Sequence, residues 1–201
     1  MGRRLWRPEN NDGRYRGSVT VHEALMLSLN VPIVRLGLDV SVRAVAETLR
    51  HAGLSVRNET PAILLGALEA SPLEIARAYA VFLGQGERPL VRLERGTPGA
   101  PEPVFHPAVA ASVRAILEDV PRRGTAAALA GLVSGHLAAK TGTTDERRDS
   151  WFVALRPRIV TVVWVGTDGN SETALYGATG ALEIWRQIDA RMPPVWQRGA
   201  F

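Results

Sequence analysis

Residues 137–166 read LAAKTGTTDERRDSWFVALRPRIVTVVWVG, and this stretch decides the expected fold. Three segments within it have the β-branched and aromatic composition, or the Thr-Gly ending, that indicates strands: 137–142, 150–155 and 159–166. The loops between them, 145–149 and 156–158, are short, and connections of this length join antiparallel neighbours. The stretch therefore predicts an antiparallel meander.

Helical periodicity dominates the sequence before and after this meander. Thr20 with Glu23, and Ser71 with Glu74, have capping-box spacing and predict two helix starts. Expected helices are Thr20 to a stop at Pro32, 41–53, 71–84, about 107–118 with Val109, Val113, Ile116 and Leu117 inward, a short one after Thr125, and about 179–190. Residues 85–105 are expected to form a loop or weak hairpin. Helices, a meander and a closing helix together predict an α+β layer fold.

The composition is that of a globular chain and excludes several classes of protein. The 201 residues are 46% apolar and 22% charged, which suits one domain or part of a larger one. Without Cys there is no disulfide framework or thiolate nucleophile, and the four His lack metal-site spacing, so neither metal nor cofactor is expected. Five Arg and two acids in residues 1–20 supply +3 of the net +4, which leaves no basic stripe for nucleic acid. No stretch has the length of a membrane span or the pattern of a signal peptide.

One lysine stands among the 24 cationic residues, and the other 23 are Arg. This residue, Lys140, opens the segment Lys-Thr-Gly-Thr-Thr, and a lysine can exchange protons when its environment shifts its pKa. Gly142 lies at a strand end, where a missing side chain lets a substrate backbone approach. The hydroxyls of Thr141, Thr143 and Thr144 offer donors to an anion. The strand edge is therefore suited to an extended peptide with a terminal carboxylate.

A second segment, Ser28-Leu29-Asn30, is expected at the C-terminal end of the first helix, because Pro32 stops that helix. Alone, this triplet is explained equally well by a helix-end cap. Together with a later Lys-Thr-Gly, it supplies two of the three motifs of the serine penicillin-recognising enzymes.

On these motifs the chain resembles the transpeptidase domain of the bifunctional (class A) penicillin-binding proteins, in particular the 1B type, over about residues 5–190. Further segments carry the resemblance: 23–32, 64–68, 71–76, 123–126, 149–152, 163–166 and 176–181. Ala139 stands where the family usually has Gly. The resemblance implies a serine β-lactamase/penicillin-binding transpeptidase-like α+β fold, an antiparallel sheet with helices packed on it. The expected division is an irregular lead-in at 1–19, a partial transpeptidase domain at 20–191 and a tail at 192–201.

The resemblance also implies a mechanism. In the family, the serine of a Ser-x-x-Lys motif attacks the D-Ala-D-Ala end of a peptidoglycan stem peptide, and an amine of a neighbouring stem peptide resolves the acyl-enzyme into a cross-link. β-Lactams are trapped at the acyl stage. By this resemblance Ser28 would relay a proton, Asn30 would bond the substrate backbone, and Lys140 would supply positive potential. The substrate would be bound by Thr141, Gly142, Thr143 and Thr144, with the Thr143 N–H as half of an oxyanion hole.

One departure from the family pattern follows from the count of lysines. Because the only lysine belongs to Lys-Thr-Gly, this sequence contains no Ser-x-x-Lys. We therefore expect an N-terminally truncated fragment, which also lacks the membrane anchor and glycosyltransferase domain of a protein at the periplasmic face of the bacterial inner membrane. Two alternatives are a non-catalytic module that binds stem peptides and, without the resemblance, a basic nucleic-acid-binding module.

Overall fold

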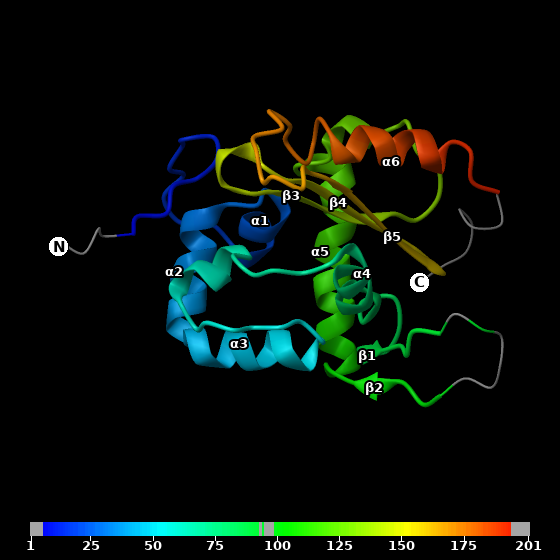
Figure 1. Cartoon of the computed structure of the whole chain (residues 1–201), viewed down its shortest axis with the longest axis horizontal. Helices are drawn as coiled ribbons and strands as arrows, with labels where there is room; N and C mark the ends of the chain where they lie inside the picture. The colour runs from blue at the N-terminus through cyan, green and yellow to red at the C-terminus, as the bar shows by residue number, and fades with distance from the viewer. Residues whose placement is uncertain (1–5, 93, 95–98, 194–201) are drawn as a thin grey trace.

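The computed structural model describes residues 6–92, 94 and 99–193 (Figure 1). The helices are α1 (Val21–Met26), α2 (Asn30–Val40), α3 (Val42–His51), α4 (Pro72–Ala80), α5 (Pro107–Arg123) and α6 (Ala181–Asp189), with 3-10 turns η1 (Pro61–Leu65), η2 (Ala127–Leu129) and η3 (Asp145–Arg147). The strands are β1 (Glu87–Arg88), β2 (Glu102–Pro103), β3 (Ala138–Thr143), β4 (Ser150–Arg156) and β5 (Ile159–Val165). Residues 6–20 form turns and extended segments without helix or strand. The expected lead-in and tail lie partly outside the described residues, at 1–5 and 194–201.

The meander predicted from 137–166 is present, with each strand boundary within one residue of its expected position. The strands pair antiparallel in the order β3-β4-β5, and Lys140 lies opposite Val153 while Gly142 lies opposite Trp151. In the described part of the chain β3 pairs only with β4, so its other edge is open. The predicted weak hairpin is also confirmed, as the short pair β1 and β2.

Helices cover both faces of this sheet, because successive side chains of a strand point to opposite sides. On one face Phe152 packs against Trp185 of α6, with ring centroids 5.2 Å apart. On the other face Leu155 packs in a cluster with Leu117 of α5 and Tyr79 of α4. Figure 1 shows α6 on one side of the three strands, with α4 and the middle of α5 on the other. The layered arrangement follows from the burial of two apolar strand faces.

The capping boxes predicted from spacing are formed. The side chains of Thr20 and Ser71 accept from the backbone N–H groups of Glu23 and Glu74, and each glutamate accepts in return from the cap N–H. Ser41 caps α3 by accepting from the N–H of Ala44. These helix starts are readable from sequence because the groups that satisfy them lie three residues apart.

Three helix ends differ from expectation, and the simplest case is α4, which ends at Ala80 and is followed by turns rather than continuing to Gly84. Helix α1 ends at Met26, and Pro32 lies in the first turn of a new helix, α2, rather than at a helix stop. The first-turn N–H groups of a helix have no intrahelical partner, so a proline costs nothing there. Asn30 therefore begins a helix instead of ending one. Helix α5 continues past Glu118 and through Pro121 to Arg123, and Val109, expected inward, is 49% exposed.

Candidate active site

Ser28 occupies the turn between α1 and α2 in an unusual backbone conformation. Its φ is +53°, in the left-handed region that non-glycine residues rarely adopt. The turn is held by the Ser28 N–H, which donates to the carbonyl of Leu25 at 3.2 Å. This conformation directs the Ser28 hydroxyl to Lys140, whose Nζ donates to Ser28 Oγ at 2.7 Å.

Lys140 lies in the middle of β3, and its amino group is enclosed. Besides Ser28 Oγ, its Nζ donates to the carbonyl of Thr141 at 2.9 Å. Burial lowers the pKa of Lys140 to about 8, since the charged form loses solvation there. A lysine with such a pKa exchanges protons close to neutral pH, which is the requirement for a group in a proton relay.

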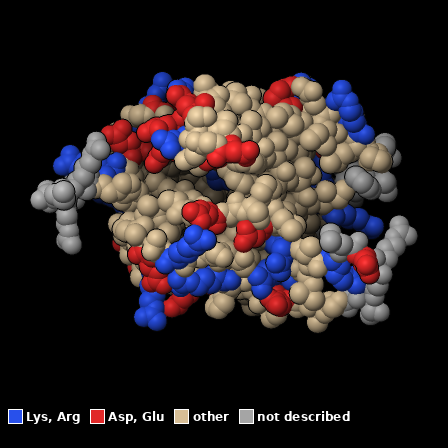
Figure 2. Space-filling view, viewed as in Figure 1, with Lys and Arg blue, Asp and Glu red and all other residues tan. Residues whose placement is uncertain are grey.

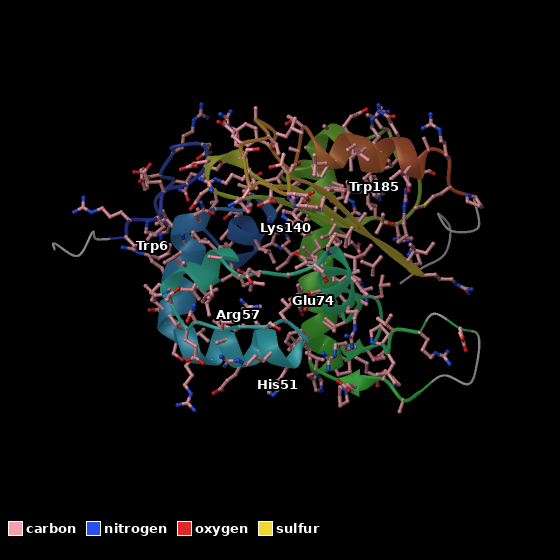
Figure 3. All side chains as sticks on the ribbon, in the orientation of Figure 1. Trp6, His51, Arg57, Glu74, Lys140 and Trp185 are labelled. Atoms are coloured by element: carbon pink, nitrogen blue, oxygen red, sulfur yellow. The ribbon has the colours of Figure 1, made fainter. Side chains whose placement is uncertain are left out.

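A cleft of about 710 Å³ lies between the sheet and the segment that runs from α3 through η1 to α4. Its sheet wall is formed by residues 140–144 of the Lys-Thr-Gly-Thr-Thr segment together with Trp151, Val153 and Trp164. The facing wall is mostly apolar and includes Leu49, Leu54, Ile63, Ile75 and Tyr79. Figure 2 shows a hollow near the centre of the face turned to the viewer, with side chains of both charges around it. Figure 3 places Lys140 near the middle of the same view.

The open edge of β3 presents a backbone donor. The Thr144 N–H donates toward β4, to the carbonyl of Asp149 at 3.2 Å. Since neighbouring N–H groups along a strand point in opposite directions, the Thr143 N–H faces the open edge. The Thr143 hydroxyl accepts from the Gly177 N–H at 3.0 Å, and the Thr141 hydroxyl bonds the Thr125 hydroxyl at 2.6 Å.

A hydrogen-bond network at the rim of the cleft fixes the C-terminal end of β3. The Asp149 carboxylate accepts from Thr144 Oγ1 at 3.0 Å and from the indole N–H of Trp164 at 2.8 Å. The Asp149 N–H in turn donates to Thr144 Oγ1 at 2.9 Å. The network joins β3 to β5 across the start of β4, and the Trp151 and Trp164 rings lie 6.0 Å apart beside it.

The structure brings most of the predicted site residues together, but not all. Ser28 contacts Lys140, while Thr141, Gly142, Thr143 and Thr144 line the cleft next to it. Asn30 is elsewhere, because its side-chain amide donates to the carbonyl of Glu9 at 2.8 Å and it is absent from the described cleft lining. Its role therefore stays a prediction.

Sequence reasoning missed two contributors, Thr125 and Asp149. Both lie in segments that carry the family resemblance, 123–126 and 149–152. No spacing rule signals their contacts, because Thr125 bonds Thr141 sixteen positions away, and Asp149 bonds Trp164 fifteen positions away as well as Thr144 across the β3–β4 loop.

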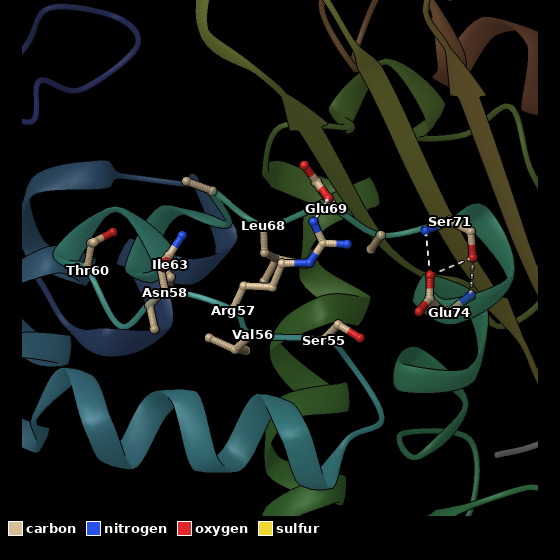
Figure 4. Close-up of a pocket in the computed structure, with 12 residues that line it drawn as sticks. Ser55, Val56, Arg57, Asn58, Thr60, Ile63, Leu68, Glu69, Ser71 and Glu74 are labelled. Carbon is tan, nitrogen blue, oxygen red and sulfur yellow. Dashed lines mark hydrogen bonds and ion pairs between the residues drawn. The ribbon is translucent and has the colours of Figure 1, made fainter.

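A second, polar hollow of about 540 Å³ adjoins the cleft and shares its 68–71 wall. Figure 4 shows Arg57 reaching across it to Glu69, with Nη1 and Oε2 3.0 Å apart. Both side chains are mostly exposed, and Ser71 and Glu74 are engaged in their capping box. No group of three or more metal-ligating side chains, and no helix able to cross a membrane, occurs among the described residues.

Comparison with known proteins assigns this arrangement to a family. The model of the penicillin binding protein transpeptidase domain matches residues 2–183. The chain belongs to the penicillin-binding protein transpeptidase family. This match spans nearly the whole sequence, as the resemblance at the motifs led us to expect, and the predicted family and fold class are thereby confirmed.

The relatives are class A penicillin-binding proteins of both the 1B and the 1A type, among them the 1A protein of Neisseria cinerea at 35% identity over 90% of this chain. The chain is 35% identical to penicillin-binding protein 1B of Escherichia coli (strain K12) and 37% identical to that of Vibrio cholerae, over 94% of its length in each case. It spans only about a quarter of these relatives, 24% and 26% of their lengths. The fold matches the crystal structure of penicillin-binding protein 1A from Haemophilus influenzae with a TM-score of 0.88 at 22% identity, covering 100% of this chain and 38% of that one.

Proposed function

We propose that this chain is part of a peptidoglycan D,D-transpeptidase that cross-links stem peptides through a serine acyl-enzyme. The observation that supports this most is the contact of Lys140 with Ser28 at 2.7 Å, which joins two motif residues 112 positions apart. A chance resemblance of two short motifs gives no reason for their side chains to meet.

Each group has a role that its geometry suits. The stem peptide would lie along the open edge of β3 as an added strand, with its D-Ala-D-Ala carboxylate at the hydroxyls of Thr141 and Thr143. The outward Thr143 N–H would donate to the developing oxyanion. Lys140, with its lowered pKa, and Ser28, bonded to it, would pass a proton to the leaving amine. A β-lactam, whose carboxylate and carbonyl are similarly placed, would occupy the same groups.

The reacting serine is not encoded in these 201 residues, since they contain no Ser-x-x-Lys. The proposed whole protein supplies that serine, a membrane anchor and a glycosyltransferase domain from other residues, and acts at the periplasmic face of the bacterial inner membrane. The present chain would then bind a stem peptide reversibly and would form no acyl-enzyme.

Two measurements on the chain test this proposal. Incubation with fluorescent penicillin should leave no covalent label on the denatured chain. One boil-resistant label per chain would contradict the inference that the reacting serine is absent. Titration with acetyl-D-Ala-D-Ala should show reversible binding that Lys140→Met abolishes. Arg43→Met is the matched control, because Arg43 is an exposed cation paired with Glu47 on α3. Equal binding by Lys140→Met and the unchanged chain is incompatible with the proposed site.

The absence of Ser-x-x-Lys also favours a second candidate, a non-catalytic stem-peptide-binding module of the same fold. The coding sequence ahead of Met1 separates the two. A Ser-x-x-Lys in the same reading frame favours the transpeptidase, and a stop codon directly before Met1 favours the binding module.

A further inference from the structure

We propose that Thr125 is a positioning residue of this site, which orients the Thr141 hydroxyl toward a bound carboxylate and couples it to the turn that carries Ser28. The proposal rests on the proposed function, because it concerns the same stem-peptide site. Thr125 lies 16 residues before Thr141 in sequence, and its contact with Thr141 is created by the fold.

The backbone around Thr125 is fixed by close packing of α5 against the end of α1. Gly124 caps α5, and a side chain there would place its Cβ 2.5 Å from the Met26 carbonyl oxygen and 2.8 Å from the Val120 Cα. The Thr125 N–H donates to that same Met26 carbonyl at 3.4 Å. Met26 is the last residue of α1 and stands two positions before Ser28, so Thr125 is attached directly to the Ser28 turn.

The side chain of Thr125 makes the second attachment. Its Oγ1 lies 2.6 Å from Thr141 Oγ1, and both residues are partly buried. A hydroxyl pair contains two protons, of which the mutual hydrogen bond uses one. If Thr125 donates, the Thr141 proton remains for a ligand oxygen, which is the arrangement that a carboxylate requires. Without the Thr125 hydroxyl, the Thr141 O–H is free to rotate away from the ligand.

The Lys140 amino group lies next to both contacts of Thr125. Its Nζ donates to the carbonyl of Thr141, whose side chain Thr125 bonds, and to the hydroxyl of Ser28, which lies two positions after the Met26 that the Thr125 backbone bonds. A shift of Thr141 therefore changes the surroundings of the Lys140 amino group. Since Lys140 is the only lysine in the sequence, a chain labelled with [ε-¹³C]lysine gives one resonance that reports on this position.

The experiment compares Thr125→Val, which removes the hydroxyl at nearly constant shape, with Thr125→Ser, which keeps it. Acetyl-D-Ala-D-Ala and its C-terminal amide are titrated by calorimetry. Thr125→Val should weaken binding of the acid about tenfold and change binding of the amide by less than about twofold, because only the acid presents a carboxylate. Thr125→Ser should restore the acid to within about threefold of the unchanged chain. Thr48→Val on α3, which also removes an intrachain hydroxyl contact, should change neither.

The possible outcomes distinguish failure of the Thr125 role from failure of the proposed function. Unchanged acid binding by Thr125→Val overturns the positioning role, and so does an equal loss for acid and amide, which indicates general structural damage. If the unchanged chain binds neither peptide, the proposed function fails. The Lys140 resonance then decides the coupling: a shift in Thr125→Val that Thr125→Ser reverses supports it, and no shift overturns it. Should Thr125→Val not fold, Thr125→Ala against Thr125→Ser makes the same comparison.

Discussion

At the level of single residues, the site depends on an enclosed lysine that has hydroxyl and carbonyl oxygens around it. Desolvation penalises the ammonium form, while the oxygens of Ser28 and Thr141 offset only part of that penalty. An arginine stays protonated under the same conditions, because its pKa lies far higher. This difference gives a physical reason for one lysine in a chain that otherwise uses arginine for every cation.

The titration of Lys140 is the first prediction. The [ε-¹³C]lysine resonance of the folded chain should titrate with a midpoint near pH 8, because burial lowers the pKa of Lys140 to about that value. In the chain unfolded by urea the same resonance should titrate near pH 10.4, the ordinary value for lysine. A folded-state midpoint above pH 10 is inconsistent with an enclosed amino group. Ser28→Ala should lower the midpoint further, since it removes an oxygen that accepts from the ammonium.

The same shift makes stability depend on pH. Below pH 8 both folded and unfolded chains hold the Lys140 proton, and the folded chain bears the full desolvation cost. Between about pH 8 and pH 10 the unfolded chain binds more protons, so the free energy of unfolding should rise by up to about 1.4 kcal/mol per pH unit. Burial raises the pKa of Tyr79 to about 12, which reverses this trend above pH 10. Urea unfolding of Lys140→Met, which lacks the rise, isolates the contribution of the lysine.

At the level of elements, a buried ion pair joins β4 to α6. Arg156 Nη2 and Nε lie 2.6 and 3.1 Å from the two carboxylate oxygens of Asp189, and the two side chains are 2% and 5% exposed. The guanidinium also bonds the carbonyls of Ser134 and His136 and lies over the Trp185 ring. Arg156 therefore ties both α6 and the segment before β3 to strand β4.

Removing one partner of this pair should be costly. Arg156→Met is expected to lower the free energy of unfolding by about 3–5 kcal/mol, because it removes a guanidinium that bonds both oxygens of the buried Asp189 carboxylate. The double variant Arg156→Met with Asp189→Leu should be less destabilised than the single variant, since no charge remains buried. Urea denaturation of four chains measures this: the unchanged chain, Arg156→Met, Asp189→Leu and the double variant. A double variant that loses as much as the two single variants combined rules out compensation between the charges.

Sequence patterns predicted elements whose determinants are local. The meander, the capping boxes and the α3 start depend on residues a few positions apart, and their boundaries were confirmed. Helix α2 was missed for two reasons. Its start at Asn30 has no side-chain cap, and Pro32 in its first turn equally well indicates the end of a preceding helix. The last turn of α5 was missed for a related reason: Pro121 reads as a stop, but packing of the helix end against α1 maintains it.

At the level of the whole molecule, separate apolar clusters hold its parts together. The largest cluster joins the sheet to α6 and includes Phe152 and Trp185. A smaller cluster of Ala46, Val56 and Ile63 holds α3 to η1 on the far side of the cleft. Figure 1 shows α3 separated from the three-stranded sheet by the segment that runs to α4.

This division predicts unequal local stability. Amide hydrogens of α3 should exchange through an opening of lower free energy than those of β4, because the α3 cluster buries fewer and smaller side chains. Native-state hydrogen exchange at low denaturant measures both openings in one sample. Ala46→Gly should lower the opening free energy of α3 while leaving that of β4 unchanged. Identical exchange free energies in α3 and β4 indicate instead that the chain unfolds as one unit.

The sequence by itself determined the strand pattern, the helix starts that have a side-chain cap, the family and the motifs that carry its chemistry, because these depend on short spacings. It also determined by simple counting that no Ser-x-x-Lys is present. Only the tertiary structure decided that Ser28 meets Lys140, that Asn30 faces Glu9, and that Thr125 holds Thr141. Those contacts join residues 16 to 112 positions apart. The contacts at β3 depend on packing of α5 against both β3 and α1, which no local pattern records.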